Sequence, residues 1–149
     1  MLPEEIQLEI VTPAKQVLRE KVESTEIPGK NGYLGILPGH APLITELGIG
    51  QLSYSKGGET FFLTAMGGFA EVLPDRVIVL AEVSERAEEI DAQRAGTALG
   101  RAREQMAKPP ADFDWDRAKL ALERALIRVQ VASKGGPAGG TADTSRAGH

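Results

Sequence analysis

The fold of the N-terminal part is decided by residues 52–64, whose sequence is LSYSKGGETFFLT. Two runs suited to strands flank the pair Gly57 and Gly58. The two central residues of a tight hairpin turn need positive φ angles, which glycine adopts without a steric penalty. The stretch therefore predicts two antiparallel strands joined at the two glycines.

The sequence on either side of this hairpin also favours short strands. Pro74 and Asp75 separate two further apolar runs, and proline sets the φ angle required at the first corner of a turn. Turn signals recur every 8–12 residues, as in sandwiches and barrels. We therefore expect an antiparallel β-sandwich over residues 1–84. Its first strand shows the alternation of a half-buried strand, with apolar residues at Ile6, Leu8 and Ile10.

Beyond residue 84 the composition changes to Ala, Glu and Arg, which predicts helices. Ser84 is the expected N-cap of the first helix, and Pro109 ends it because the residue before proline avoids the α region. Asp114 is the expected N-cap of the second helix. We expect an antiparallel helical hairpin over residues 85–132 and a disordered tail over 133–149. The apolar stripes predicted for the two helices are Ala87, Ile90, Ala95, Ala98, Ala102 and Met106, then Ala118, Leu122, Ala125 and Val129.

Composition excludes several classes of function. The net charge of -4 and the pI of about 5.3 argue against a nucleic-acid-binding protein. The absence of cysteine excludes disulfides and thiolate catalysis. The N-terminus has no signal-peptide pattern, and the apolar windows are far shorter than the roughly 20 residues that span a bilayer. We expect membrane association only through partners.

The residues also give no sign of catalysis. No phosphate-binding loop and no nucleophile elbow occur in the sequence. The only histidines are His40 and His149, so no cluster of metal ligands is expected. His40 is more simply a structural loop residue. We expect a protein that is not an enzyme by itself and that requires no cofactor.

Three segments together resemble the epsilon subunit family of bacterial F-type, or rotary, ATP synthases. They occur in the same order and spacing as in that family, and the resemblance covers roughly residues 5–132. The segments are PGKNGYLGILPGHAPLIT at 28–45, GGFAEV at 67–72 and AEVSERAEEID at 81–91.

The resemblance implies a non-catalytic subunit of the central stalk in a proton-translocating complex. In the family the β-sandwich binds the gamma subunit and the c-ring, which couples rotor rotation to ATP synthesis. The helical hairpin lies beside the sandwich or extends toward the alpha/beta catalytic head, where it inhibits ATP hydrolysis. The implied location is peripheral, on the cytoplasmic face of the bacterial inner membrane.

The apolar residues around the first segment allow two interpretations. They are core residues, or some of them form an exposed patch for a partner. The residues that we single out as candidates for partner binding are Leu34, His40 and Leu43.

The resemblance also suggests a regulatory ligand. Some bacterial members bind ATP between the C-terminal helices through the motif Ile/Leu-Asp-x-x-Arg-Ala, which residues 90–95 match in full. Guanidinium groups bind phosphate in a bidentate manner, so arginines on both helices would suit a triphosphate. The alternative is that these arginines are a solvated face. The candidate ATP-binding residues are Glu85, Ile90, Asp91, Arg94, Ala95, Arg101, Arg124 and Arg128.

Two other functions remain open from the residues alone. One is a free-standing β-sandwich binding module whose helical hairpin dimerises it. The other is a small hydrolase that uses Glu and Arg, but it lacks a nucleophile paired with a base.

Overall fold

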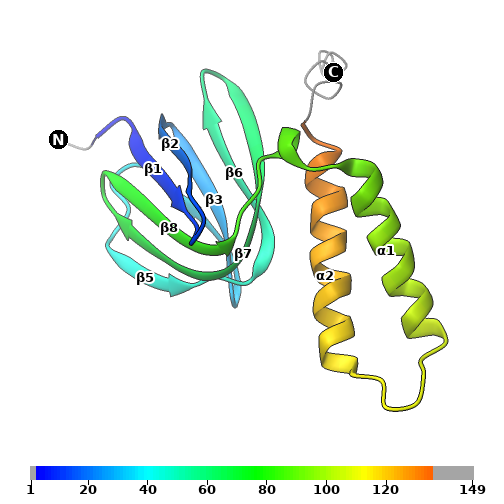
Figure 1. Cartoon of the computed structure of the whole chain (residues 1–149). Coiled ribbons are helices and arrows are strands. Elements are labelled where there is room, and N and C mark those ends of the chain that lie inside the picture. Colours follow the sequence, from blue (N-terminus) through cyan, green and yellow to red (C-terminus); the bar gives the residue numbers. More distant parts are fainter. Residues whose placement is uncertain (1–2, 136–149) are drawn as a thin grey trace. The chain divides into compact units, whose positions relative to one another are not determined.

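Residues 3–135 are described by a computed structural model, in which eight strands precede two helices (Figure 1). This order confirms the prediction of a β-sandwich followed by a helical hairpin. The chain divides after Arg86 into two compact units. The strands are β1 (Ile6–Val11), β2 (Gln16–Val22), β3 (Ser24–Gly29), β4 (Gly32–Ile36), β5 (Leu43–Glu46), β6 (Ile49–Lys56), β7 (Glu59–Leu73) and β8 (Arg76–Val83).

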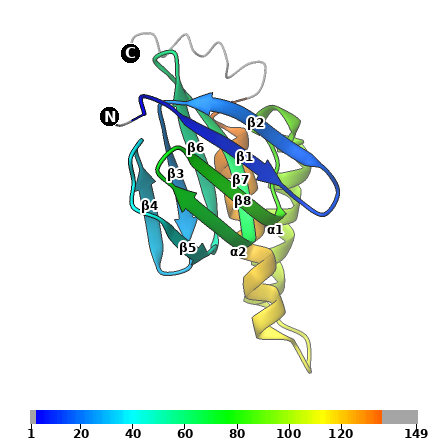
Figure 2. The same ribbon diagram turned by 90° about the vertical axis from the view of Figure 1, so that its left-hand side faces the viewer.

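The strands follow the order β2-β1-β8-β7-β6-β3-β4, and β5 pairs with β7. All these pairs are antiparallel except β1–β8, which is parallel. In Figure 2 the arrows of β1 and β8 point the same way. The prediction of antiparallel pairing is therefore wrong for this one pair. The physical reason is that no tight turn links β1 to β8, so no local signal fixes their relative direction.

Both predicted hairpins are confirmed. β6 and β7 are joined at Gly57 and Gly58, whose φ angles are 61° and 79°. β7 and β8 are joined at Pro74 and Asp75. Turn residues that tolerate or impose the required φ angles thus determine both connections.

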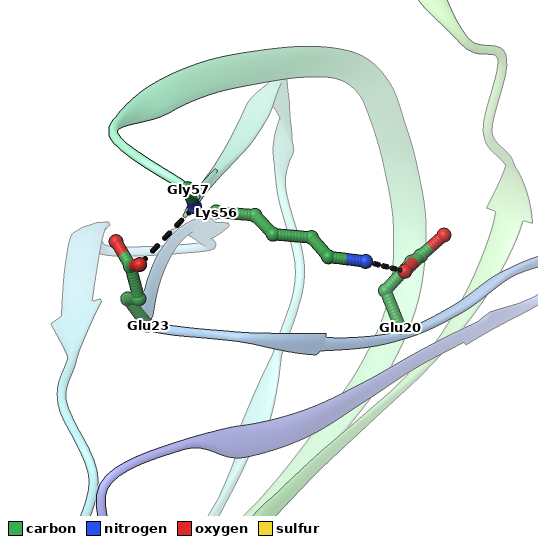
Figure 3. A network of polar contacts seen from close by, with 4 residues as sticks. All are labelled: Glu20, Glu23, Lys56 and Gly57. Carbon is green, nitrogen blue, oxygen red and sulfur yellow. Dashed lines mark hydrogen bonds and ion pairs between the residues drawn. The ribbon is translucent and has the colours of Figure 1, made fainter.

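The β6–β7 hairpin is tied to the chain around β2 by polar contacts (Figure 3). Lys56 Nζ donates to Glu20 Oε1 on β2. Gly57 N donates to Glu23 Oε2 over 3.1 Å. The hydrogen bond to Glu20 raises the pKa of Lys56 above its usual value of 10.5, so the ammonium stays charged at neutral pH.

A single core fills the space between the layers of the sandwich. The predicted alternation of β1 is confirmed, because Ile6, Leu8 and Ile10 are fully buried. Leu34 and Leu43 are half-buried and pack against the same core. The other large, almost fully buried side chains include Leu18, Ile27, Ile36, Leu52, Leu63, Val72 and Val77.

The second unit is an antiparallel pair of helices, α1 (Ala92–Ala107) and α2 (Trp115–Ala132), preceded by a short 3₁₀ helix, η1 (Ala87–Glu89). The carboxylates of Asp91 and Asp114 cap the two helices by accepting from the main-chain N–H three residues later. The predicted cap at Asp114 and the predicted end before Pro109 are confirmed. The buried residues of α1 are Ala95, Leu99 and Ala102.

The predicted N-cap at Ser84 is wrong, because α1 begins at Ala92. Ser84 is buried, and its hydroxyl donates to the carbonyl of Thr64 in β7 over 2.8 Å.

The predicted domain boundary after residue 84 lies two residues before the division at Arg86. Ala98, placed in the predicted apolar stripe, is exposed, and the neighbouring Leu99 is buried instead. Residues 136–149 of the predicted tail lie outside the described residues.

Within residues 3–135, neither helix is long and apolar enough to cross a membrane. The same part of the chain contains no group of three or more His, Asp or Glu side chains arranged to hold a metal ion.

Candidate functional site

Three large apolar side chains lie exposed on neighbouring strands of the sandwich. Ile44 on β5 is 71% exposed, and Phe69 on β7 and Leu80 on β8 are each 55% exposed. Phe69 pairs directly with Leu80, whereas Ile44 pairs with Glu71, two residues along β7 from Phe69. Diagonal and direct cross-strand neighbours on one face lie within reach of each other. We call these three residues the outer apolar face.

The outer apolar face results from the period of two along each strand. In β7 the residues Ala70 and Val72 point into the core, so Phe69 and Glu71 point outward. Glu46, opposite Phe69, and Glu71, opposite Ile44, are both exposed. Large apolar side chains bordered by carboxylates are typical of a surface that another protein covers.

The predicted partner-binding residues lie elsewhere or are less accessible. Leu34 and Leu43 are half-buried against the core, so much of their surface already has a structural role. His40 is half-buried, and its Nδ1 lies 2.7 Å from the carbonyl oxygen of Ala41. Their role in partner binding stays a prediction. Sequence reasoning missed Phe69 and Leu80, although their outward positions in alternating strands were a usable signal.

The last residues of the first unit are anchored to the sandwich around Thr64. The fully buried Thr64 accepts from Glu85 N through its hydroxyl over 2.9 Å, and its own N–H donates to Glu85 O over 2.9 Å. The Thr64 hydroxyl also donates to Glu85 Oε1 over 3.3 Å. Arg86 adds two bonds from Nε and Nη2 to the carbonyl of Val17 on β2. The segment from Ser84 to Arg86 is therefore an integral part of the sandwich.

This anchor separates the predicted ATP-binding residues into two groups. Glu85 belongs to the first unit, and its carboxylate already accepts the hydrogen bond from Thr64. The other seven belong to the helical unit, where Asp91 caps α1 and Ala95 is buried between the helices. Ile90 is half-buried just before that cap.

The helical unit carries an arginine face on one side. On α1, Arg94 and Arg101 lie on the same side of the buried row formed by Ala95, Leu99 and Ala102. The two arginines are about 10 Å apart along the helix axis. On α2, Arg124 and Arg128 lie beside the residues that face α1, turned around the helix axis in the same direction as Arg94 and Arg101 are on α1. When two antiparallel helices pack together, residues turned in the same direction from the contact lie on the same side of the pair. Arg94, Arg101 and Arg124 are exposed and Arg128 is half-buried. We call these four residues the arginine face.

Two further arginines lie near the arginine face, one on the same side of the helix pair and one on the opposite side. Arg117, one turn before Ala121 and two before Arg124, extends the face toward the start of α2. Arg103 is exposed on α1 but lies on the opposite side of the buried row, which makes it a natural reference position. Guanidinium groups gathered on one side of two packed helices form a positively charged surface that can attract an anion.

Comparison with known families covers nearly the whole described chain. Residues 5–87 match the model of the β-sandwich domain of the ATP synthase delta/epsilon chain. Residues 88–133 match the model of the long α-helix domain of the same chain.

Individual relatives agree with the family match. The ATP synthase epsilon chain 2 of Syntrophotalea carbinolica is 45% identical over 136 residues, covering 91% of this chain and 99% of the relative. The ATP synthase epsilon chain of Koribacter versatilis is 60% identical over 100 residues, covering 67% of this chain and 70% of the relative. A chain in a cryo-EM structure of the Euglena gracilis mitochondrial ATP synthase, containing OSCP, F1 and the c-ring, superposes with a TM-score of 0.75. It is 27% identical, and the match covers 89% of this chain and 83% of that one.

Proposed function

Because this chain belongs to the delta/epsilon chain family of ATP synthases and is a subunit that is not catalytic by itself, we propose that it is a rotor-stalk subunit. In this proposal the sandwich docks on the gamma subunit and the c-ring, and the helical unit can reach the alpha/beta catalytic head. The subunit would sit peripherally on the cytoplasmic face of the bacterial inner membrane and couple proton-driven rotation to ATP synthesis. The observation that carries the proposal is the outer apolar face, which gives the sandwich a surface for a protein partner.

The sandwich suits the transmission of torque. Its single core and its pairing through all eight strands make it a stiff body, since packed interiors deform little. A docking surface built on β5, β7 and β8 shares strand β7 with Thr64, to which Ser84 and Glu85 are hydrogen-bonded. Force applied at the docking surface would therefore pass through hydrogen-bonded strands to the end of the first unit.

The first prediction concerns docking. We expect Phe69→Ser to weaken binding to a gamma subunit or to a synthase head that lacks epsilon. Removal of a large apolar side chain at the centre of an interface costs about 2 kcal/mol, or roughly thirty-fold in Kd. Titration of labelled chain onto the depleted head measures the change.

A matched variant tests the position of the docking surface. Phe61 is 38% exposed at the β6–β7 hairpin and stacks on Tyr54, away from the outer apolar face. We expect Phe61→Ser to bind like the original chain. Equal loss in both variants, or no loss in the Phe69 variant, would contradict docking through the outer apolar face.

We also propose that the helical unit is regulatory, with ATP as its ligand and inhibition of ATP hydrolysis as its output. The support is the arginine face next to the capped motif at residues 90–95. ATP bound to arginines of both helices would link α1 to α2 and stabilise the packed pair of helices. A ligand that prefers the packed pair would thereby disfavour an extended, inhibitory arrangement.

The second prediction tests this ligand. We expect calorimetric titration with ATP to give saturable heat, and Arg124→Ala to weaken the affinity by about ten-fold or more, since hydrogen bonds to charged groups contribute about 1.5–3 kcal/mol. Arg103→Ala, on the opposite flank of α1, should bind ATP like the original chain. An absence of heat at millimolar ATP, or equal affinities of all three proteins, would reject the ATP site and leave the docking proposal intact.

A further inference from the structure

Asn31 is the only asparagine in the chain, and glycine follows it. The pair Asn31 and Gly32 lies where the turn between β3 and β4 ends. Both residues are exposed. A Cβ placed on Gly32 would meet no atom within 4 Å, so the space beside this glycine is open.

The turn is held by contacts of Lys30 within it and of Tyr33 directly after it, whose hydroxyl accepts from Gln51 N on β6 over 3.1 Å. Lys30 N donates to the carbonyl of Glu46 over 2.9 Å, and Lys30 Nζ lies 3.5 Å from Glu46 Oε1. At its outer edge, β4 is the last strand in the sheet order and has no further neighbour among the described strands. The hairpin ends with the pair Gly29 and Gly32, and neither Asn31 nor Gly32 belongs to the core.

The reaction of an Asn-Gly pair needs no group other than these two residues and water. The main-chain nitrogen of Gly32 attacks Cγ of Asn31, a new C–N bond forms, and the Cγ–Nδ2 bond breaks. The amide proton of Gly32 leaves with the departing group as ammonia, and a five-membered succinimide remains. Water then opens the ring at either carbonyl, so that asparagine plus water becomes aspartate or isoaspartate plus ammonia. Glycine at the second position permits this ring closure because it has no side chain to obstruct the attack.

We propose that Asn31 is a site of spontaneous deamidation, at which the native turn converts mainly to isoaspartate. The product carries a new carboxylate beside the Lys30–Glu46 ion pair. Its main chain is one carbon longer, so the end pair between Gly29 and Gly32 can no longer form in the original register. An isoaspartate in an exposed turn is also a substrate for a carboxyl methyltransferase that recognises isoaspartyl residues and takes its methyl group from S-adenosylmethionine.

The test uses the full chain, incubated at body temperature in mildly alkaline buffer beside a synthetic peptide with the sequence PGKNGYLG. Peptide mapping by mass spectrometry follows the gain of about one dalton at residue 31 and separates aspartate from isoaspartate. Methyl transfer from S-adenosylmethionine, catalysed by an isoaspartyl methyltransferase, counts the isoaspartate independently. Asn31→Ser keeps a small polar turn residue and is the matched control.

We expect the full chain to accumulate isoaspartate at residue 31 during the same incubation that converts the peptide, and to become a methyl acceptor in proportion. The Asn31→Ser chain should acquire neither signal. If the peptide converts and the folded chain keeps its asparagine, the fold protects the site and the proposal is wrong. Conversion to aspartate without isoaspartate would also overturn it, because a succinimide gives both products.

Discussion

Two glycines in β7 make the outer apolar face possible. β7 pairs with β6 as far as Met66 and with β5 from Phe69 onward, and Gly67 and Gly68 between them have φ angles of 71° and 100°. A Cβ on Gly68 would overlap the carbonyl oxygen of Leu80. The change of partner, and with it the outward direction of Phe69, therefore depends on glycine at this position.

At this residue scale we expect Gly68→Ala to destabilise the sandwich. The variant combines a positive φ angle, which costs about 1–3 kcal/mol in a non-glycine residue, with a main-chain clash. Urea unfolding followed by tyrosine fluorescence measures the loss, because both tyrosines, Tyr33 and Tyr54, lie in the sandwich. Gly35→Ala, where a Cβ meets no atom within 4 Å, is the control and should change little. Equal stabilities of the two variants would contradict this account of the bend.

The sequence alone does not predict which of two adjacent apolar residues is exposed. Leu43 and Ile44 are adjacent and equally apolar, yet Leu43 packs against the core and Ile44 is 71% exposed. The alternation within a strand is readable from sequence, but the side that faces the core depends on pairing with distant strands. The sequence therefore indicated that some residues of this segment could be exposed without indicating which ones.

At the scale of elements, α1 is a weak helix. Gly96 and Gly100 lie on its exposed surface, where an added Cβ would meet no atom within 4 Å. Interior glycine costs a helix about 1 kcal/mol relative to alanine. The buried residues Ala95 and Ala102 are small, so packing against α2 compensates little.

We expect Gly96→Ala to stabilise the helical unit by about 1 kcal/mol. Trp115, the single tryptophan, begins α2 and packs edge-to-face on Phe113, so its fluorescence reports the unfolding of this unit. Thr97→Gly at an exposed neighbouring position should have the opposite effect. An unchanged midpoint in both variants would show that the propensity of α1 does not limit the stability of the unit.

The start of α1 was mispredicted because a tertiary contact competes with a local signal. Ser84 followed by glutamates resembles a helix start. In the structure, however, the backbone of Glu85 is paired with Thr64, and the side chain of Ser84 donates to β7. The helix can begin only after this anchored segment, at the next residue that caps well, Asp91.

On the scale of the whole molecule, the two units divide the proposed roles. A chain that ends at Arg86 retains the core, the outer apolar face and the Thr64 anchor. We expect it to bind the depleted head with the affinity of the full chain but to leave ATP hydrolysis uninhibited. Hydrolysis assays at saturating concentrations of each chain measure this difference. Inhibition by the short chain would contradict the regulatory role of the helices, and loss of binding would contradict docking by the sandwich alone.

The family and the succession of sandwich and helices were predictable, because specific motifs and turn residues are local features of the sequence. The family that the three motifs indicated is confirmed by matches over residues 5–87 and 88–133. The parallel pairing of β1 with β8 was not predictable, since it joins the first and last strands of the sandwich, which are far apart in the sequence. The predicted ATP-binding residues stay a prediction, and the contact of Glu85 with Thr64 could not be foreseen from spacing.

The parallel pair also governs when the protein can fold during synthesis. Ile10 pairs with Val79, so β1 has only its hairpin partner β2 until almost the entire sandwich has left the ribosome. Contacts between such distant residues slow folding because a long loop must close first. The nascent chain therefore exposes the apolar side of β1 for most of its translation, and chaperone binding should concentrate on that interval. It should end soon after β8 emerges.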